Sequence, residues 1–177
     1  VTVPTPCFGA YISQCKVLGF RSVEAKCRWE NGFVLQASDI EALVTDRTRA
    51  VVVNTPNNPT GAVTPRGEME KIAEIAQKYD LLVIADECYE RFVYGGQHIS
   101  IASLPEMAER TATVGAASKP YYMTGWRHGL LAMPARMTAF ANPSPLPMNT
   151  CAPSFPASAF VSALDGSGPH GQGTRRD

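Results

Sequence analysis

Residues 51–61 read VVVNTPNNPTG, and this stretch indicates the fold of the 177-residue chain most clearly. Three β-branched apolar residues lead into a rigid loop of Asn, Pro and Gly, which is typical of a buried strand that delivers polar groups at its carboxyl end. Residues 81–89, LLVIADECY, repeat the pattern. Open α/β sheets bind ligands beyond the carboxyl ends of their strands, so we expect Asn58, Asp86 and Tyr89 to converge on one crevice.

A helix is predicted between these two strands. Proline at position 65 suits the first turn of a helix, and apolar residues then recur at helical spacing to about Tyr79. Strand, helix and strand form a βαβ unit with a right-handed crossover. The predicted fold class is therefore α/β, with a mainly parallel sheet flanked by helices. Further strands are expected at 22–27, 111–114 and 130–133, and further helices at 11–20 and 38–44, the latter opening on Ser38 and Glu41 as a capping box.

Residues 117–129, ASKPYYMTGWRHG, contain a lysine eight residues before an arginine. Apolar surroundings disfavour an ammonium ion, so Lys119 is a candidate amine nucleophile for a carbonyl group. Arg127 stays charged and can hold a phosphate through its planar fork of donors. A cofactor with both a carbonyl and a phosphate is implied, and pyridoxal phosphate meets both requirements.

Three blocks together carry a family resemblance: residues 54–61 (NTPNNPTG), 86–89 (DECY) and 118–129 (SKPYYMTGWRHG). In this order and separation they resemble the signature blocks of the fold-type I, class I/II pyridoxal-phosphate-dependent aminotransferases, and the wording TGWR is similar to aspartate and broad-specificity members. The resemblance covers about residues 1–164, which would be the central part of the cofactor-binding large domain. The Gly-rich residues 165–177 are expected to be a disordered tail.

The resemblance also implies roles for individual residues. Lys119 would hold pyridoxal phosphate covalently as a Schiff base and would move the proton of the substrate α-carbon. Asp86 would pair with the pyridine nitrogen and keep the ring protonated, which favours its action as an electron sink. Without the motifs, a lone lysine is usually a solvated surface charge, and an Asp after a strand can be a helix N-cap.

Five further positions complete the site that the resemblance implies. Tyr89 and Asn58 would hydrogen-bond the phenolic oxygen of the ring. Arg127 would bind the phosphate, with Ser118 as a second candidate beside the lysine. Phe8 matches the position where this family stacks an aromatic ring on the pyridine face.

Other conspicuous residues have plainer interpretations. Trp126 is expected to pack in the core, and Cys88 to be a small packing residue. No metal site is expected, because the three histidines, His98, His128 and His170, show no metal-ligand spacing.

Composition limits the function classes. Lys plus Arg equals Asp plus Glu at 16 each, so charge gives no indication of nucleic acid or an acidic membrane surface. No apolar run approaches a membrane span of about 20 residues, and no signal-peptide pattern is present. Five cysteines without a CxxC motif indicate free thiols in a reducing compartment, the cytoplasm.

The leading hypothesis is an aminotransferase that moves an amino group from an amino acid to a 2-oxo acid by a ping-pong mechanism, as a homodimer in its full-length form. The alternative is an aminotransferase-like sensor domain of a transcription regulator, which binds the cofactor without turnover. The chain begins with valine and has less than half the length that this family needs. It is therefore expected to be a truncated piece, which could be inactive because the small domain and part of the phosphate site are missing.

Overall fold

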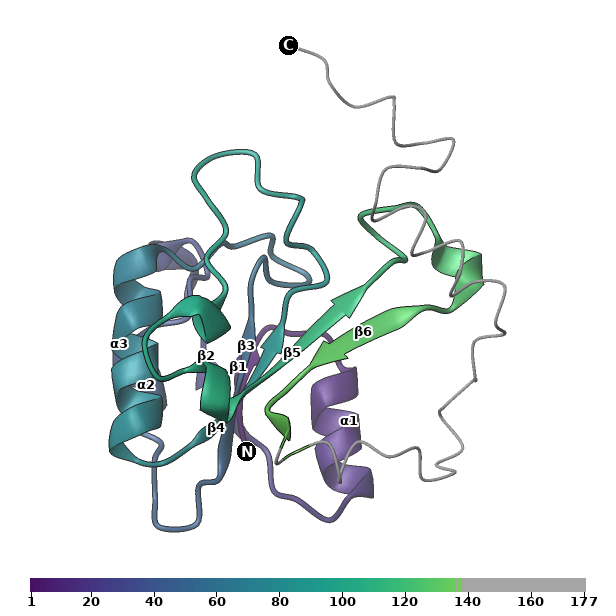
Figure 1. Ribbon diagram of the computed structural model, residues 1–177. Helices are drawn as coiled ribbons and strands as arrows, with labels where there is room; N and C mark the ends of the chain where they lie inside the picture. The colour runs from purple at the N-terminus through teal and green to yellow at the C-terminus, as the bar shows by residue number, and fades with distance from the viewer. Residues whose placement is uncertain (136, 138–177) are drawn as a thin grey trace.

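The computed structural model describes residues 1–135 and residue 137. Within them, six strands form one sheet in the order β2-β1-β3-β4-β5-β6 (Figure 1). The first five strands of this order are parallel, and the edge strand β6 runs antiparallel to β5. The predicted α/β class with a mainly parallel sheet is confirmed. The strands are β1 Thr2–Thr5, β2 Val23–Lys26, β3 Ala50–Asn54, β4 Leu82–Asp86, β5 Thr111–Ala116 and β6 Gly129–Ala132.

Helices cover both faces of the sheet. The chain moves from β1 to β2 in one direction across the sheet and from β3 to β4 in the other. Right-handed crossovers in opposite directions place their helices on opposite faces. Accordingly, α1 (Ala10–Val17) lies on one side, and α2 (Ala37–Glu41) and α3 (Arg66–Lys78) lie together on the other (Figure 1). The described chain also contains short 3₁₀ turns: η1 Trp29–Asn31, η2 Ile101–Ser103, η3 Ala108–Arg110 and η4 Thr124–Trp126.

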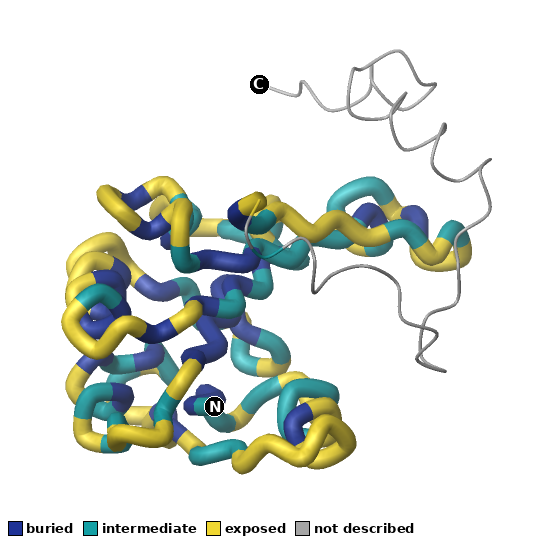
Figure 2. The backbone as a smooth tube through the Cα atoms, turned by 60° about the horizontal axis from the view of Figure 1, so that its bottom comes forward, coloured by how far each residue is buried: buried dark blue, intermediate teal, exposed yellow. Residues whose placement is uncertain are grey.

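The main core lies between the sheet and the α2/α3 layer. Helix α3 buries one apolar stripe, of which Met69 and Ile72 are fully inaccessible. Val51 and Val53 of β3 and Val83 of β4 pack into the same cluster. Figure 2 shows the buried residues gathered inside the body and the exposed residues on its outer turns. None of the described helices is long and apolar enough to cross a membrane.

Strand alternation assigns a face to each residue of β3 and β4. Val83 belongs to the α3-side core, so its neighbour Ile84 faces the α1 side, and Asp86 follows on that same side. Asn54 is the register partner of Asp86. The last residues of the two strands therefore direct their polar side chains to the α1 face.

The predicted helix at 11–20 ends earlier than expected. Helix α1 stops at Val17, and Gly19 adopts a left-handed conformation with a φ of 75°. The amide of Phe20 donates to the carbonyl oxygen of Cys15 at 2.8 Å, and that of Gly19 donates to Lys16 at 3.2 Å. These two bonds form a Schellman motif, which terminates the helix.

The predicted capping box at Ser38 is wrong. Helix α2 begins at Ala37, one residue earlier, with Gln36 in the N-cap position and no side-chain cap bond from it. The amide of Ala37 instead donates to a carboxylate oxygen of Glu68 on α3 at 3.0 Å. A tertiary contact therefore caps this helix.

Strand β1 was not predicted from the sequence, and its Pro4 is a residue that is uncommon inside a strand. The structure tolerates Pro4 there, since β1 pairs with β3 only at Thr2. The strand at 22–27 corresponds to β2, and those at 111–114 and 130–133 correspond to β5 and β6 with boundaries shifted by one or two residues. The predicted tail at 165–177 lies outside the described residues.

Candidate active site

The candidate site begins where the sheet changes winding direction. Strands β1 and β3 are neighbours, yet their crossovers leave in opposite directions, so the topological switch point lies between them. The loops beyond their carboxyl ends are joined by a hydrogen bond from Asn57 Nδ2 to the carbonyl oxygen of Pro6 at 3.1 Å. Phe8 and Asn58 lie on these two loops.

Asn54 links Asn58 to Asp86. Its Nδ2 donates to the carbonyl oxygen of Asp86 at 3.0 Å, and its Oδ1 accepts the amide of Asn58 at 2.9 Å. Asn54 is buried, so water does not compete for these bonds. The start of the Asn-Pro loop is thereby fixed to the end of β4.

Tyr11 holds the carboxylate of Asp86. Its hydroxyl donates to Asp86 Oδ2 at 2.5 Å, while Asp86 Oδ1 accepts the amide of Cys88 at 3.1 Å. Burial, followed by the hydrogen bond to Asp86, raises the pKa of the Tyr11 phenol, so this group stays protonated and remains a donor. The Phe8 ring packs edge-on against the Tyr11 ring with a centroid separation of 5.9 Å.

Tyr11 was missed by the sequence interpretation. The available signal was a second aromatic ring three residues after Phe8, at the start of a predicted helix. Sequence alone could not show that this ring is turned to the end of β4.

Lys119 approaches the turn that follows β4. Its Nζ lies 5.9 Å from the centroid of the Tyr89 ring. Burial, then the negative charge of Asp86, raises the pKa of the Cys88 thiol to about 12, and the positive charge of Lys119 acts in the opposite direction. The positive charge of Lys119 therefore lies close enough to interact with both Tyr89 and Cys88.

The loop that carries Lys119 has an unusual backbone. Tyr122 and Arg127 are non-glycine residues with φ values of 56° and 53°. Such conformations cost about 1–3 kcal/mol each and are concentrated at functional sites. Trp126 packs against the buried pair Ala117 and Met123, as expected for a core residue.

The predicted site residues are only partly assembled. Asp86, Tyr89 and Lys119 lie around the turn after β4. Phe8 is connected to Asp86 indirectly, since its ring packs against Tyr11, which is hydrogen-bonded to Asp86. Asn58 is connected to Asp86 in the same indirect way, through hydrogen bonds of Asn54. Ser118 is half-buried in the turn after β5. Arg127 is exposed, and its Nη1 donates to the carbonyl oxygen of Thr124 on its own loop at 3.2 Å.

A cavity of about 220 Å³ lies beside this group and not within it. Pro120 and Tyr121, next to Lys119, form part of its wall, and Glu87, Glu90 and Arg91 form another part. Asp86, Asn58 and Lys119 are not among the residues that line this cavity.

Comparison with known proteins shows one consistent family. The sequence profile described as "Aminotransferase class I and II" matches residues 1–174. The chain is 42% identical over 165 residues to arginine–pyruvate transaminase of Pseudomonas aeruginosa, covering 93% of this chain and 42% of that protein. It is 47% identical over 135 residues to aromatic-amino-acid aminotransferase 2 of Thermococcus litoralis, covering 76% of this chain and 35% of that protein.

Solved structures agree with the sequence matches. Aspartate aminotransferase from Thermus thermophilus, solved with maleate, superposes with a TM-score of 0.85 at 33% identity, covering 94% of this chain and 43% of that one. The chain thus spans less than half the length of the relatives that it matches. Both the profile match over almost the whole chain and the identity to named transaminases lead to one conclusion: the chain belongs to the class I and II aminotransferases.

Proposed function

We propose that this chain forms part of a pyridoxal-phosphate-dependent aminotransferase, which moves an amino group from an amino acid to a 2-oxo acid. The observation that carries the proposal is the placement of the Lys119 amine at the Tyr89 ring, on the turn that follows Asp86. Two signature blocks distant in sequence are thereby adjacent in space. Family membership supports the same chemistry.

The donor set fits pyridoxal phosphate. A primary amine at Lys119 matches its aldehyde, a carboxylate at Asp86 matches its pyridine nitrogen, and a guanidinium at Arg127 matches its phosphate. Both oxygens of Asp86 already accept hydrogen bonds, so its orientation is fixed before any ligand arrives. Tyr89 and Asn58 would donate to the phenolic oxygen, Ser118 would assist at the phosphate, and Phe8 would cover the ring face.

When bound, pyridoxal phosphate supplies the electron sink for the pair released when the Cα–H bond of the substrate breaks. Lys119 Nζ would accept that proton, because the resemblance assigns this amine to the general base of the site. Asp86 would pair with the pyridine nitrogen and favour its protonated form. Tyr11 acts through Asp86 as a positioning residue.

The amino acid donor is proposed only as a class. The similar proteins are named for arginine, aromatic amino acids and aspartate, so the family includes donors with different side chains. We also infer a cytoplasmic homodimer: the described cysteines are free thiols, and Val17, Leu18 and Phe20 are more than half exposed apolar side chains that suit an interface. No observation favours the sensor-domain alternative, and the relatives compared above are named as aminotransferases.

Cofactor attachment tests the proposal directly. The purified chain is mixed with pyridoxal phosphate, its visible absorbance is recorded, and borohydride reduction followed by mass spectrometry locates the label. We expect one labelled site at Lys119, lost in Lys119→Ala and retained in Lys71→Ala, a surface lysine paired with Glu68. Label scattered over surface lysines and unchanged by Lys119→Ala would contradict the proposal. Transfer from amino acid donors to pyruvate and other 2-oxo acids is then measured separately.

A further inference from the structure

Glu87 faces away from the proposed cofactor site. Its amide donates to the carbonyl oxygen of Val114 at 2.9 Å, which continues the ladder between β4 and β5 by one residue. Successive strand residues point to opposite faces, so Asp86 is directed to the α1 side and Glu87 to the α3 side. The surroundings of Glu87 therefore form a separate place in the fold.

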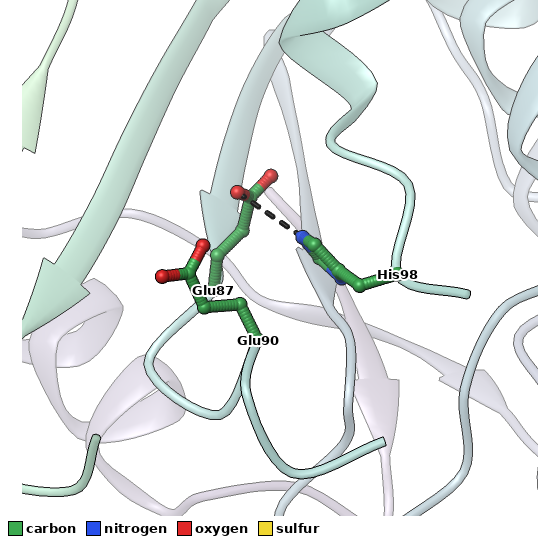
Figure 3. A group of neighbouring side chains, drawn as sticks. All are labelled: Glu87, Glu90 and His98. Atoms are coloured by element: carbon green, nitrogen blue, oxygen red, sulfur yellow. Dashed lines mark ion pairs between the residues drawn. The ribbon is translucent and has the colours of Figure 1, made fainter. Parts of the chain in front are cut away.

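Three potential metal ligands meet at this place. Carboxylate oxygens of Glu87 and Glu90 and a ring nitrogen of His98 lie within 4.8 Å of one another. Figure 3 shows the three side chains converging from the end of β4, the turn that follows it, and the loop before η2. Nε2 of His98 lies 3.3 Å from Oε2 of Glu87.

The buried members of this group lack hydrogen bonds. Glu87 is 7% exposed, and its Oε1 has no hydrogen-bond partner among the described residues. Neither ring nitrogen of His98 makes a hydrogen bond to the described chain, so the contact between His98 and Glu87 is close without the geometry of one. A buried carboxylate oxygen without a partner is costly, which points to a ligand that the protein residues do not supply.

We propose that Glu87, Glu90 and His98 bind one divalent transition-metal ion, of which zinc is the type. Two carboxylate oxygens and one imidazole nitrogen are a suitable ligand set for zinc, with bonds of about 2.0–2.2 Å. Tetrahedral geometry at those lengths requires ligand atoms about 3.4 Å apart, so the group must contract on binding. Glu90 is exposed, so its side chain has room to supply this movement.

The fourth coordination position has space. Glu87 and Glu90 both line the cavity of about 220 Å³, which is large enough for water or a small anion. The ion would join the end of β4 to the segment that contains His98, and would hold in place the turn that carries Tyr89. It does not depend on the proposed transaminase chemistry.

Arg91 is the cation that opposes this site. Its Nε lies 3.8 Å from Oε1 of Glu90, in an exposed ion pair. Such a pair contributes up to about 1 kcal/mol, so metal coordination can displace it. Arg91 would retain a second contact, because its Nη2 donates to the Tyr121 hydroxyl at 3.2 Å.

Histidine spacing gave no indication of this site, because two of its three ligands are glutamates. The expectation that the chain holds no metal is replaced here by a proposal that can be tested.

Cobalt titration of the full 177-residue chain, kept reduced, tests the site. The visible absorption bands of Co²⁺ change with its ligands and geometry, so binding can be followed by absorbance. Thiolate ligands add a separate band in the near ultraviolet, which identifies binding at cysteines. The variants are Glu90→Gln and His98→Gln. Glu70→Gln is the matched control, since Glu70 is also half-exposed and paired with a neighbouring arginine, at 3.4 Å. Circular dichroism confirms that each variant is folded.

We expect one Co²⁺ per chain without the thiolate band, displaced by Zn²⁺. Affinity should fall at least about tenfold in Glu90→Gln and in His98→Gln and stay unchanged in Glu70→Gln. The proposal is overturned by a thiolate band, by the absence of saturable binding, or by equal affinity in Glu90→Gln and the wild type. Because Glu90 is exposed, its replacement keeps the test independent of folding.

Discussion

The hydroxyl group of Tyr11 donates a hydrogen bond to Oδ2 of Asp86 at 2.5 Å, and so connects helix α1 to the end of strand β4 across the face of the sheet. The contact spans 75 residues of sequence. It holds in place the carboxylate that we assign to the cofactor nitrogen.

Replacement of Tyr11 by Phe tests this relationship. The variant removes one hydrogen bond to a charged group, an interaction typically of about 1.5–3 kcal/mol, and leaves the carboxylate held by the amide of Cys88. We expect pyridoxal phosphate affinity, measured by spectral titration, to fall about tenfold. Tyr79→Phe is the matched control, because the Tyr79 hydroxyl also contacts a carboxylate, that of Glu41, at 3.1 Å. Equal losses in both variants would show that Tyr11 has no specific role.

Arg127 is tested by comparing pyridoxal phosphate with pyridoxal. The two ligands differ only in the phosphate, so their affinity ratio isolates the phosphate contact. We expect Arg127→Gln to reduce this ratio about tenfold, because a charge-assisted bidentate interaction is lost. Arg91→Gln should leave the ratio unchanged. If Arg127→Gln leaves the ratio of pyridoxal phosphate affinity to pyridoxal affinity unchanged, Arg127 does not bind the phosphate.

Reactivity of Cys88 follows from its environment. Burial and the Asp86 carboxylate raise its pKa from 9.0 to about 12. Thiolate is the reactive form, so alkylation of Cys88 by iodoacetamide at pH 8 should be at least about a hundredfold slower in the native chain than in urea. Rates are read by mass spectrometry of the peptide that contains Cys88. Equal rates in the two states would show that the thiol is not protected.

Stability should depend on pH through Glu68. Hydrogen bonding from the Ala37 amide, then from Lys71, lowers its pKa below the ordinary value of 4.5. The folded state therefore gains stability that is fully present above pH 4.5 and is lost as the pH falls through the lower folded-state pKa.

Urea denaturation of Glu68→Gln measures this contribution. At pH 7 the variant should lose about 1 kcal/mol of unfolding free energy, and the difference from the wild type should shrink below about pH 4.5. Glu70→Gln, which removes only an exposed ion pair, should change stability by less than about 0.5 kcal/mol. A difference for Glu68→Gln that persists unchanged in acid would refute the electrostatic explanation.

Packing of α3 on the sheet is tested at Ile72. This side chain is completely buried, and its truncation to Ala should cost about 3 kcal/mol through lost burial and the cavity left behind. Lys71→Ala on the exposed side of the same helix should be nearly neutral. A similar cost for both variants, measured by urea denaturation, would place Ile72 outside the core.

The sequence was most informative where local pattern and tertiary structure agree. Helix α3 could be predicted because its apolar spacing matches the face that packs on β3 and β4. Helix α2 could not be bounded correctly, since its cap is a carboxylate from Glu68, 31 residues away. The same limit applies to Tyr11, whose relation to Asp86 depends on which face of the sheet α1 covers.

The three signature blocks predicted the position of Lys119 relative to Tyr89 only through family resemblance. Spacing alone does not set strand order, and the order β4-β5 is what brings these blocks together. Strand β6 shows the same limit. Its apolar run of four residues predicts a strand but does not indicate that the strand runs antiparallel to β5.

The adjacency of Asp86 and Glu87 has a consequence for how this chain can change. A slip of β4 by one position, or a single-residue insertion within it, would exchange the two acids between the sides of the sheet. Tyr11 would then meet the wrong side chain, and His98 would lose its carboxylate in the same event. An insertion or deletion in this strand would therefore disrupt two contacts at once, the one between Tyr11 and Asp86 and the one between His98 and Glu87.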